Sequence, residues 1–175
     1  MKTKTYNTLF IMLVVLILAT GCTSNYKYKI GVSQCVGGRW REKANIEMLS
    51  AQHLYDTDVK VIIKNADNSN ERQCLQIDSL INEGVDLLVV SPNDYHALNG
   101  SLQRAREKNI PIVFFDRTTA MKDYTAYIGG DNIEAGRKMA EYAAMLCRDS
   151  VKTEGRQPIV LEMTGPLEIS PAAQR

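Results

Sequence analysis

Several features that mark common classes of protein are missing from this 175-residue sequence. It has two histidines, four cysteines and no C-x-x-C pair, so neither a zinc site nor a disulfide framework is indicated. Its 21 lysines and arginines nearly balance its 20 aspartates and glutamates, whereas nucleic-acid binding needs a concentrated basic surface. We therefore expect no metal and no nucleic-acid partner, and free thiols at Cys35, Cys74 and Cys147. A Cys35–Cys74 bridge is the alternative, which requires that the fold bring these two residues close together.

The motifs that usually carry catalysis or nucleotide binding are also missing. The sequence has no G-x-S-x-G nucleophile elbow and no G-x-x-x-x-G-K-[ST] phosphate loop. Its stretch GVSQCVGG lacks the G-x-G-x-x-G spacing of dinucleotide-binding loops. His53 is expected on a helix surface and His96 in a loop after a strand. These absences predict a protein that binds without a cofactor and is not an enzyme.

One unbroken apolar run is present, at residues 9–19 (LFIMLVVLILA), after Lys2 and Lys4. It is too short for a membrane-spanning helix of roughly 20 apolar residues, but it has the length of a signal-peptide core. The run leads into ATGC and resembles a bacterial lipoprotein signal, in which Cys22 would carry the lipid, although Ala19 stands where leucine is usual. We interpret residues 1–21 as a lipoprotein-like signal peptide and 22–27 as a linker. Plain secretion and an uncleaved anchor are the alternatives, and all three place the rest of the chain outside the cytoplasm.

From Tyr28 onward, strand-like and helix-like segments alternate. Strands are predicted at 28–35, 59–66, 85–92, 110–116, 124–130 and 158–165, and a last helix begins near 169. Between them, apolar or small residues recur at helical spacing, as at Ala44, Met48, Ala51 and Tyr55. This alternation predicts the α/β class, with a doubly wound parallel sheet. The continuous apolar strands 85–92 and 110–116 are typical of strands covered on both faces.

Polar side chains follow the ends of the predicted strands, where open α/β sheets bind their ligands. Carboxylates accept hydrogen bonds, guanidinium groups donate them, and a sugar with adjacent hydroxyls requires both, together with an aromatic plate under its ring. Asp116 and Arg117 are expected to hydrogen-bond to neighbouring hydroxyls, and the Trp40 ring is expected to pack under the sugar ring. The alternative for Asp116 and Arg117 is a surface ion pair, worth about 0–1 kcal/mol. The residues at these ends are Ser33, Gln34, Gly37, Gly38, Arg39, Trp40, Asn65, Asp67, Asn68, Ser91, Asn93, Asp94, Asp116, Arg117, Asp131 and Asn132.

Most of the chain from Tyr28 to Arg175 resembles a known family. The stretches that carry the resemblance are IGVSQC (30–35), INEGVDLLVVSPND (81–94), NIPIVFFDR (109–117), YTAYIGGDNIEAGRKMAEY (124–142) and GPLEISPAAQR (165–175). They occur in the order found in ribose-type periplasmic binding proteins, which are related to the ligand domains of LacI-type repressors. With the Trp-Arg of its first helix, the chain is especially similar to the sugar sensor domains of Bacteroides-type hybrid two-component histidine kinases.

This resemblance implies a two-lobed clamp that closes on a monosaccharide in the periplasm of a Gram-negative bacterium. The sugar would be handed to an ABC-type permease for uptake, or sensed on behalf of a kinase. A repressor is disfavoured, because the apolar segment stands where a DNA-binding helix-turn-helix would be. An enzyme on the same fold is disfavoured by the missing catalytic sets.

The resemblance also implies roles for single residues. Trp40 and Arg39 replace phenylalanines of ribose binders, and Gly37 replaces an asparagine. These replacements argue against ribose as the ligand. The positive charge of Arg39 would allow an anionic ligand. The implied ligand contacts are Ser33, Arg39, Trp40, Asn93, Asp116, Arg117, Asp131 and Arg175.

The same resemblance divides the chain into an N-terminal lobe (28–130) and the start of a second lobe (131–175). A second lobe with its own core would require on the order of 100 further residues. We therefore expect a C-terminally truncated chain, a poorly stabilised region after about residue 131, and weak or no sugar binding by the isolated chain.

Overall fold

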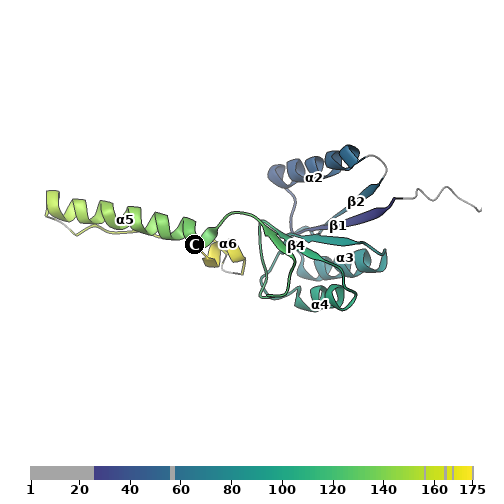
Figure 1. Cartoon of the computed structure of the whole chain (residues 1–175). Helices are drawn as coiled ribbons and strands as arrows, with labels where there is room; N and C mark the ends of the chain where they lie inside the picture. Colours follow the sequence, from purple (N-terminus) through teal and green to yellow (C-terminus); the bar gives the residue numbers. More distant parts are fainter. Residues whose placement is uncertain (1–25, 56–57, 156, 164, 167, 175) are drawn as a thin grey trace, which may run out of the picture.

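A five-stranded parallel sheet forms the centre of the structure, a computed structural model that describes residues 26–55, 58–155, 157–163, 165–166 and 168–174. The strand order is β2-β1-β3-β4-β5 (Figure 1). The strands are β1 (Tyr28–Gln34), β2 (Val59–Asn65), β3 (Leu87–Val90), β4 (Ile112–Phe115) and β5 (Ala126–Ile128). The predicted α/β class is confirmed. The predicted signal peptide, Cys22 and Arg175 lie outside the described residues.

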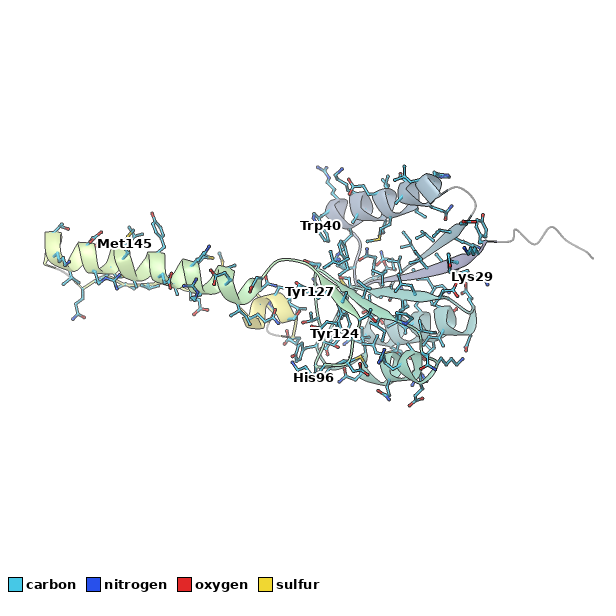
Figure 2. The ribbon with its side chains drawn as sticks, viewed as in Figure 1. Lys29, Trp40, His96, Tyr124, Tyr127 and Met145 are labelled. Atoms are coloured by element: carbon cyan, nitrogen blue, oxygen red, sulfur yellow. The ribbon has the colours of Figure 1, made fainter. Side chains whose placement is uncertain are left out.

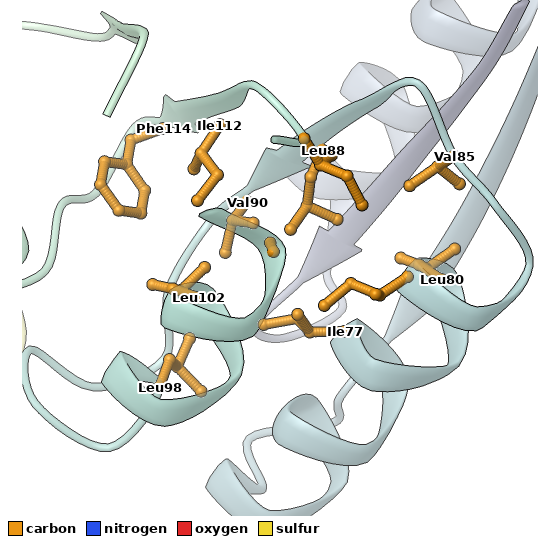
Figure 3. Packing of buried hydrophobic residues seen from close by; sticks show 12 residues of the cluster. Ile77, Leu80, Val85, Leu88, Val90, Leu98, Leu102, Ile112 and Phe114 are labelled. Carbon is orange, nitrogen blue, oxygen red and sulfur yellow. The ribbon is translucent and has the colours of Figure 1, made fainter. Parts of the chain in front are cut away.

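Helices cover the two faces of the sheet unequally. Helix α2 (Arg39–Gln52), followed by a short 3-10 turn η1 (His53–Tyr55), lies on one side, and α3 (Asn70–Asn82) and α4 (Asn99–Glu107) lie on the other (Figure 1). The hydrophobic core forms on the second side, where Ile77 and Leu102 of the helices pack against Leu88, Val90 and Phe114 of the strands (Figure 3). The alternate residues of β3 and β4 are only half-buried. The face of the sheet that carries α2 is therefore covered less completely than the continuous apolar strands predict.

The chain after β5 leaves this core. Helix α5 (Asn132–Glu154) extends away from the sheet, and the short helix α6 (Ser170–Gln174) packs near its beginning (Figure 1). The carboxylate of Asp131 caps α5 by accepting a hydrogen bond from the Glu134 amide at 2.9 Å, and Gly155, with a φ of 67°, ends the helix in the left-handed conformation. Several large apolar side chains of α5 are exposed to solvent: Ile133, Met139, Tyr142, Met145, Leu146 and Val151.

The strand predicted at 158–165 is wrong for the residues of that segment that the structure describes. Residues 158–163 have no strand assignment and return beside α5 (Figure 1), with Ile159 97% exposed. A β-strand forms only where a neighbouring strand completes its hydrogen bonds, and the five described strands lie in a sheet that this segment does not join. In the described part of the chain, no helix is long and apolar enough to cross a membrane.

Candidate ligand-binding site

The carboxyl ends of all five strands meet at one edge of the sheet, because every neighbouring pair is parallel. The register places Ser33 beside Val90, Gln34 beside Asn65 and Phe115 beside Ile128. The residues that follow these ends therefore come from distant parts of the chain to one place. We call this place the rim and define it by Gln34, Trp40, Arg41, Asn93, Asp116 and Arg117.

The central interaction of the rim joins α2 to the end of β4. Arg41 donates from Nη2 to Oδ2 of Asp116 at 2.6 Å and from Nη1 to Oε1 of Gln34 at 3.1 Å. Gln34 in turn donates from Nε2 to Oδ1 of Asn45 at 2.8 Å. Arg41 is 5% exposed and is the one buried residue of α2. Its charge is therefore compensated by hydrogen bonds at both ends of the guanidinium group, as a buried charge requires.

Asp116 and Arg117 are adjacent in sequence but are not a close ion pair. Nε of Arg117 lies 3.9 Å from Oδ2 of Asp116, and its Nη1 lies 3.5 Å from the carbonyl oxygen of Pro92. Asp116 has a φ of 66°, a left-handed conformation that few residues other than glycine adopt. This turn separates the two side chains. The ion pair between Asp116 and Arg117 that the sequence left open as an alternative is present at this longer distance, and the close pair of Asp116 is with Arg41.

Aromatic rings lie directly beside this ion pair. The rings of Trp40 and Phe115 are stacked, with centroids 5.6 Å apart and an angle of 11° between the planes. Cζ of Arg41 lies 4.6 Å from the Trp40 centroid and 5.9 Å from that of Phe115, within the range of cation–π attraction. Trp40 remains 57% exposed, at the beginning of α2 (Figure 2). An exposed aromatic surface therefore adjoins the carboxylate.

A buried glutamine of α3 links the ends of β1 and β3. Nε2 of Gln73 lies 3.2 Å from Oγ of Ser33 and donates to the carbonyl oxygen of Ser91 at 2.9 Å. Its Oε1 accepts a hydrogen bond from the amide of Asn93 at 2.9 Å. The Asn93 side chain donates to Oδ1 of Asn70 at 2.7 Å. Ser33 is thus fully buried behind the rim, whereas Asn93 is half-buried at it.

The structure brings only part of the predicted set together. Asp116, Arg117 and Trp40 share the rim, Arg39 is exposed at the first turn of α2, and Ser33 is turned inward. Asp131 lies instead at a separate pocket of about 380 Å³. Other residues that line this pocket are Tyr95, Thr118, Tyr124, Tyr127, Asn132 and Gln174 (Figure 2 labels Tyr124 and Tyr127).

The segment before α6 contacts the loops near this pocket. Oγ of Ser170 accepts a hydrogen bond from the Thr118 amide at 2.9 Å, and the carbonyl of Glu168 accepts one from the Tyr95 amide at 3.0 Å. Residues 168–174 therefore return to the loops after β3 and β4. Among the described residues, no three His, Cys, Asp or Glu side chains form a group that could hold a metal ion.

Arg41 is the rim residue to which the sequence analysis gave no role in binding, although it belongs to the Trp-Arg pair of the first helix. A signal for it exists, because Arg41, Ala44 and Met48 follow the i, i+3, i+7 spacing of one helix face. Ala44 and Met48 belong to the apolar spacing predicted for this helix and are half-buried in the structure, so Arg41 lies on the same face. Arg39 lies two positions earlier and falls on a different side of the helix.

Comparison with known proteins agrees with this architecture. Residues 30–174 match the family described as "Periplasmic binding protein domain". The chain is 31% identical over 103 residues to the D-xylose-binding periplasmic protein of Escherichia coli (strain K12), a match that covers 59% of this chain and 30% of that protein. It is 30% identical over 86 residues to the ribose import binding protein RbsB of Bacillus subtilis (strain 168), which covers 49% of this chain and 28% of that protein.

Among solved structures, the chain is similar to the fructose-binding periplasmic domain of a hybrid two-component system. The TM-score is 0.71 and the sequence identity 35%, over 84% of this chain and 46% of that one. The chain thus spans about half the length of this structure and about a third or less of the two curated relatives. The resemblance seen in the sequence is confirmed, and the family indicates the periplasm. With its parallel sheet, its strand-end rim and a family match over 30–174, the chain belongs to the periplasmic binding protein domain family.

Proposed function

We propose that the rim binds a monosaccharide in the periplasm. The observation that carries this proposal is the separation of Asp116 from Arg117, whose Nε and Oδ2 atoms are 3.9 Å apart beside the exposed ring of Trp40. An acceptor and a donor that are not closely paired with each other are available to two neighbouring hydroxyls of one sugar. The Trp40 ring offers an apolar surface to the C–H face of that sugar. Relatives named for binding xylose, ribose and fructose support the same class of ligand.

The biological use that we propose is sugar uptake, in which the loaded domain delivers its sugar to an ABC-type permease. The relatives named as import binding proteins support this use. A second candidate is sugar sensing by a hybrid two-component histidine kinase, which is favoured by the 35% identity to the periplasmic domain of such a system. A membrane helix and a kinase domain encoded in the same gene would favour sensing, whereas a permease gene beside it would favour uptake.

We further propose that a lipid on Cys22 holds the protein at the membrane. The apolar run at 9–19, followed directly by ATGC, supports this anchor. The test is metabolic labelling with a radioactive fatty acid, in which the native protein should incorporate label and Cys22→Ser should not. Equal labelling of the two proteins would reject the proposed attachment site.

Sugar binding is tested by the thermal unfolding of the full-length protein with D-fructose, D-xylose and D-ribose. A sugar present at 100 times its dissociation constant stabilises the native state by about 2.7 kcal/mol, and the midpoint of unfolding rises accordingly. We expect this shift in the native protein and its loss in Asp116→Ala. Asp123→Ala is the matched control, because Asp123 is an exposed carboxylate that pairs with Arg106 of α4, away from the rim. An undiminished shift in Asp116→Ala would rule out the role given to Asp116.

A further inference from the structure

Arg41 lies behind the ligand-facing residues of the rim and contacts several of them. We propose that Arg41 is the positioning residue of the sugar site: it fixes one oxygen of Asp116, keeps Arg117 available to the ligand, and orients the Trp40 ring. This inference rests on the proposed function. It goes beyond that function because it assigns a role to a residue that acts on the ligand through its neighbours.

The first part of the argument concerns the two carboxylate oxygens. Oδ2 of Asp116 is engaged by Nη2 of Arg41 at 2.6 Å, a typical charge-assisted hydrogen bond. Within the described residues, no hydrogen bond to Oδ1 is seen, and the Asp116 side chain is 39% exposed. The carboxylate is therefore held at its inner oxygen and presents its outer oxygen to a ligand hydroxyl. A carboxylate fixed in this way loses less rotational freedom when the sugar binds.

The second part concerns competition between two arginines for one carboxylate. Both Arg41 Nη2 and Arg117 Nε lie near Oδ2 of Asp116, but at 2.6 Å and 3.9 Å, respectively. Arg41 is also anchored to Gln34, so it occupies the position that Arg117 would otherwise take. Without Arg41, the uncompensated Asp116 would attract the adjacent guanidinium, and the two groups that should meet the sugar would bind each other. Arg41 thus prevents a pairing that would close the site.

The third part concerns the aromatic plate. Trp40 is mostly exposed, yet its ring is nearly parallel to that of Phe115, and the Arg41 guanidinium lies 4.6 Å from its centroid. Cation–π attraction acts at such a distance and holds the ring against the guanidinium group. One guanidinium group therefore fixes both the polar and the apolar contact surface of the sugar. Lysine is a poor substitute, because an ammonium group cannot form the same planar fork and stack.

The experiment compares the full-length native protein with Arg41→Met, Arg41→Lys and Lys43→Gln. Methionine keeps much of the packing volume without a charge, and Lys43 is an exposed cation on the same helix that pairs only with Glu47 among the described residues. The probes are D-fructose, D-xylose and D-ribose, measured by isothermal calorimetry. For the tightest-binding sugar we expect the dissociation constant to rise at least about tenfold in Arg41→Met and by less in Arg41→Lys. In Lys43→Gln it should stay within about twofold of the native value.

A double variant separates positioning from a general role in docking α2. If Arg41 acts through Asp116, the losses of affinity in Arg41→Met and Asp116→Asn are not additive in the combined variant. A purely structural role would give additive losses, and this result would overturn the inference. So would an Arg41→Met protein that binds its sugar within twofold of the native protein.

A structural readout distinguishes this inference from the proposed function. In the Arg41→Met protein, or in Arg41→Lys if the first variant does not fold, a crystal structure without sugar should show Arg117 within hydrogen-bond distance of Asp116, about 3 Å. If the native protein binds none of the three sugars but Arg117 moves to within hydrogen-bond distance of Asp116 in the variant, only the proposed function is rejected. An Arg117 that stays at its native distance in both variants would reject the role of Arg41.

Discussion

The hydroxyl oxygen of Tyr127, on β5, lies 3.1 Å from the main-chain carbonyl oxygen of Asp116, at the end of β4. The same hydroxyl lies 3.1 Å from the carbonyl oxygen of Gly130. A carbonyl can only accept, so the phenol hydrogen is shared between the two. Tyr127 thereby ties the left-handed turn at Asp116 to the loop after β5, so the position of the Asp116 carboxylate depends on a side chain of the neighbouring strand.

The first prediction concerns the space around Tyr127. A Cβ atom added at Gly129 would lie 2.2 Å from the Tyr127 hydroxyl oxygen and 2.5 Å from its Cζ, so the ring must move and give up its hydrogen bonds. We expect Gly129→Ala to lower the free energy of unfolding by about 1–3 kcal/mol, measured by urea denaturation. Gly130→Ala is the control, because a Cβ there has no neighbour within 4 Å. Equal losses in the two variants would point to backbone conformation and not to the Tyr127 contact.

The second prediction separates the backbone of Asp116 from its carboxylate. Its φ of 66° costs an alanine about 1–2 kcal/mol but costs glycine little. We therefore expect Asp116→Gly to be more stable than Asp116→Ala by about 1 kcal/mol in urea denaturation, because both variants lose the same ion pair with Arg41. Neither variant should show stabilisation by sugar. If alanine proved as stable as glycine, the left-handed turn would not be a property of the folded protein in solution.

The third prediction is a dependence of stability on pH. A hydrogen bond from Lys64, whose Nζ lies 2.6 Å from Oε1 of Glu83, lowers the pKa of the Glu83 carboxyl below its usual value of about 4.5. Because the pKa is lower in the folded state, the stabilisation is present above the unfolded pKa and is lost as the pH falls through the folded pKa. Lys64→Met should therefore be less stable than the native protein at neutral pH. The difference should not exceed about 1 kcal/mol, because the pair is partly exposed to solvent.

This difference should shrink as the pH falls from the usual value of about 4.5 through the lower folded pKa of Glu83, because the carboxyl then becomes protonated in both proteins. Urea denaturation at neutral and at acidic pH measures it. Lys108→Met, which changes an exposed lysine at the end of α4, should leave the pH dependence of stability as it is in the native protein. If the difference in the free energy of unfolding between Lys64→Met and the native protein did not depend on pH, the lysine would stabilise the protein through packing alone.

The fold was predictable where its causes are local in the sequence. The apolar runs that became β3 and β4 have strand-like composition, and the stripe of Cys74, Ile77 and Ile81 has helical spacing that matches α3. Strands that alternate with helices are typical of a parallel sheet, and parallel strands bring their carboxyl ends to one edge. The position of Asp116 and Arg117 at that edge follows from these rules alone.

The features that the sequence could not predict depend on contacts between distant residues. Ser33 points inward because Gln73, forty residues later, provides its hydrogen-bond partner, and no local pattern signals that pairing. The segment at 158–163 has a strand-like sequence, but a strand depends on a neighbour that the sequence of the segment cannot reveal. The choice between Arg39 and Arg41 depends on the rotation of α2 about its axis, which the weak apolar stripe of this helix specifies poorly.

Gln73 also has a consequence for how this protein could diversify. Its hydrogen bonds to Ser33, Ser91 and Asn93 hold the ends of β1 and β3 in place from the interior of the protein. Trp40 and Arg39 project outward from the first turn of α2 and take no part in these bonds. Mutations at the two outward positions can therefore accumulate without disturbing the backbone beneath them. Under the proposed function, single substitutions at these two positions would change which sugar is bound and leave the buried hydrogen bonds of Gln73 as they are.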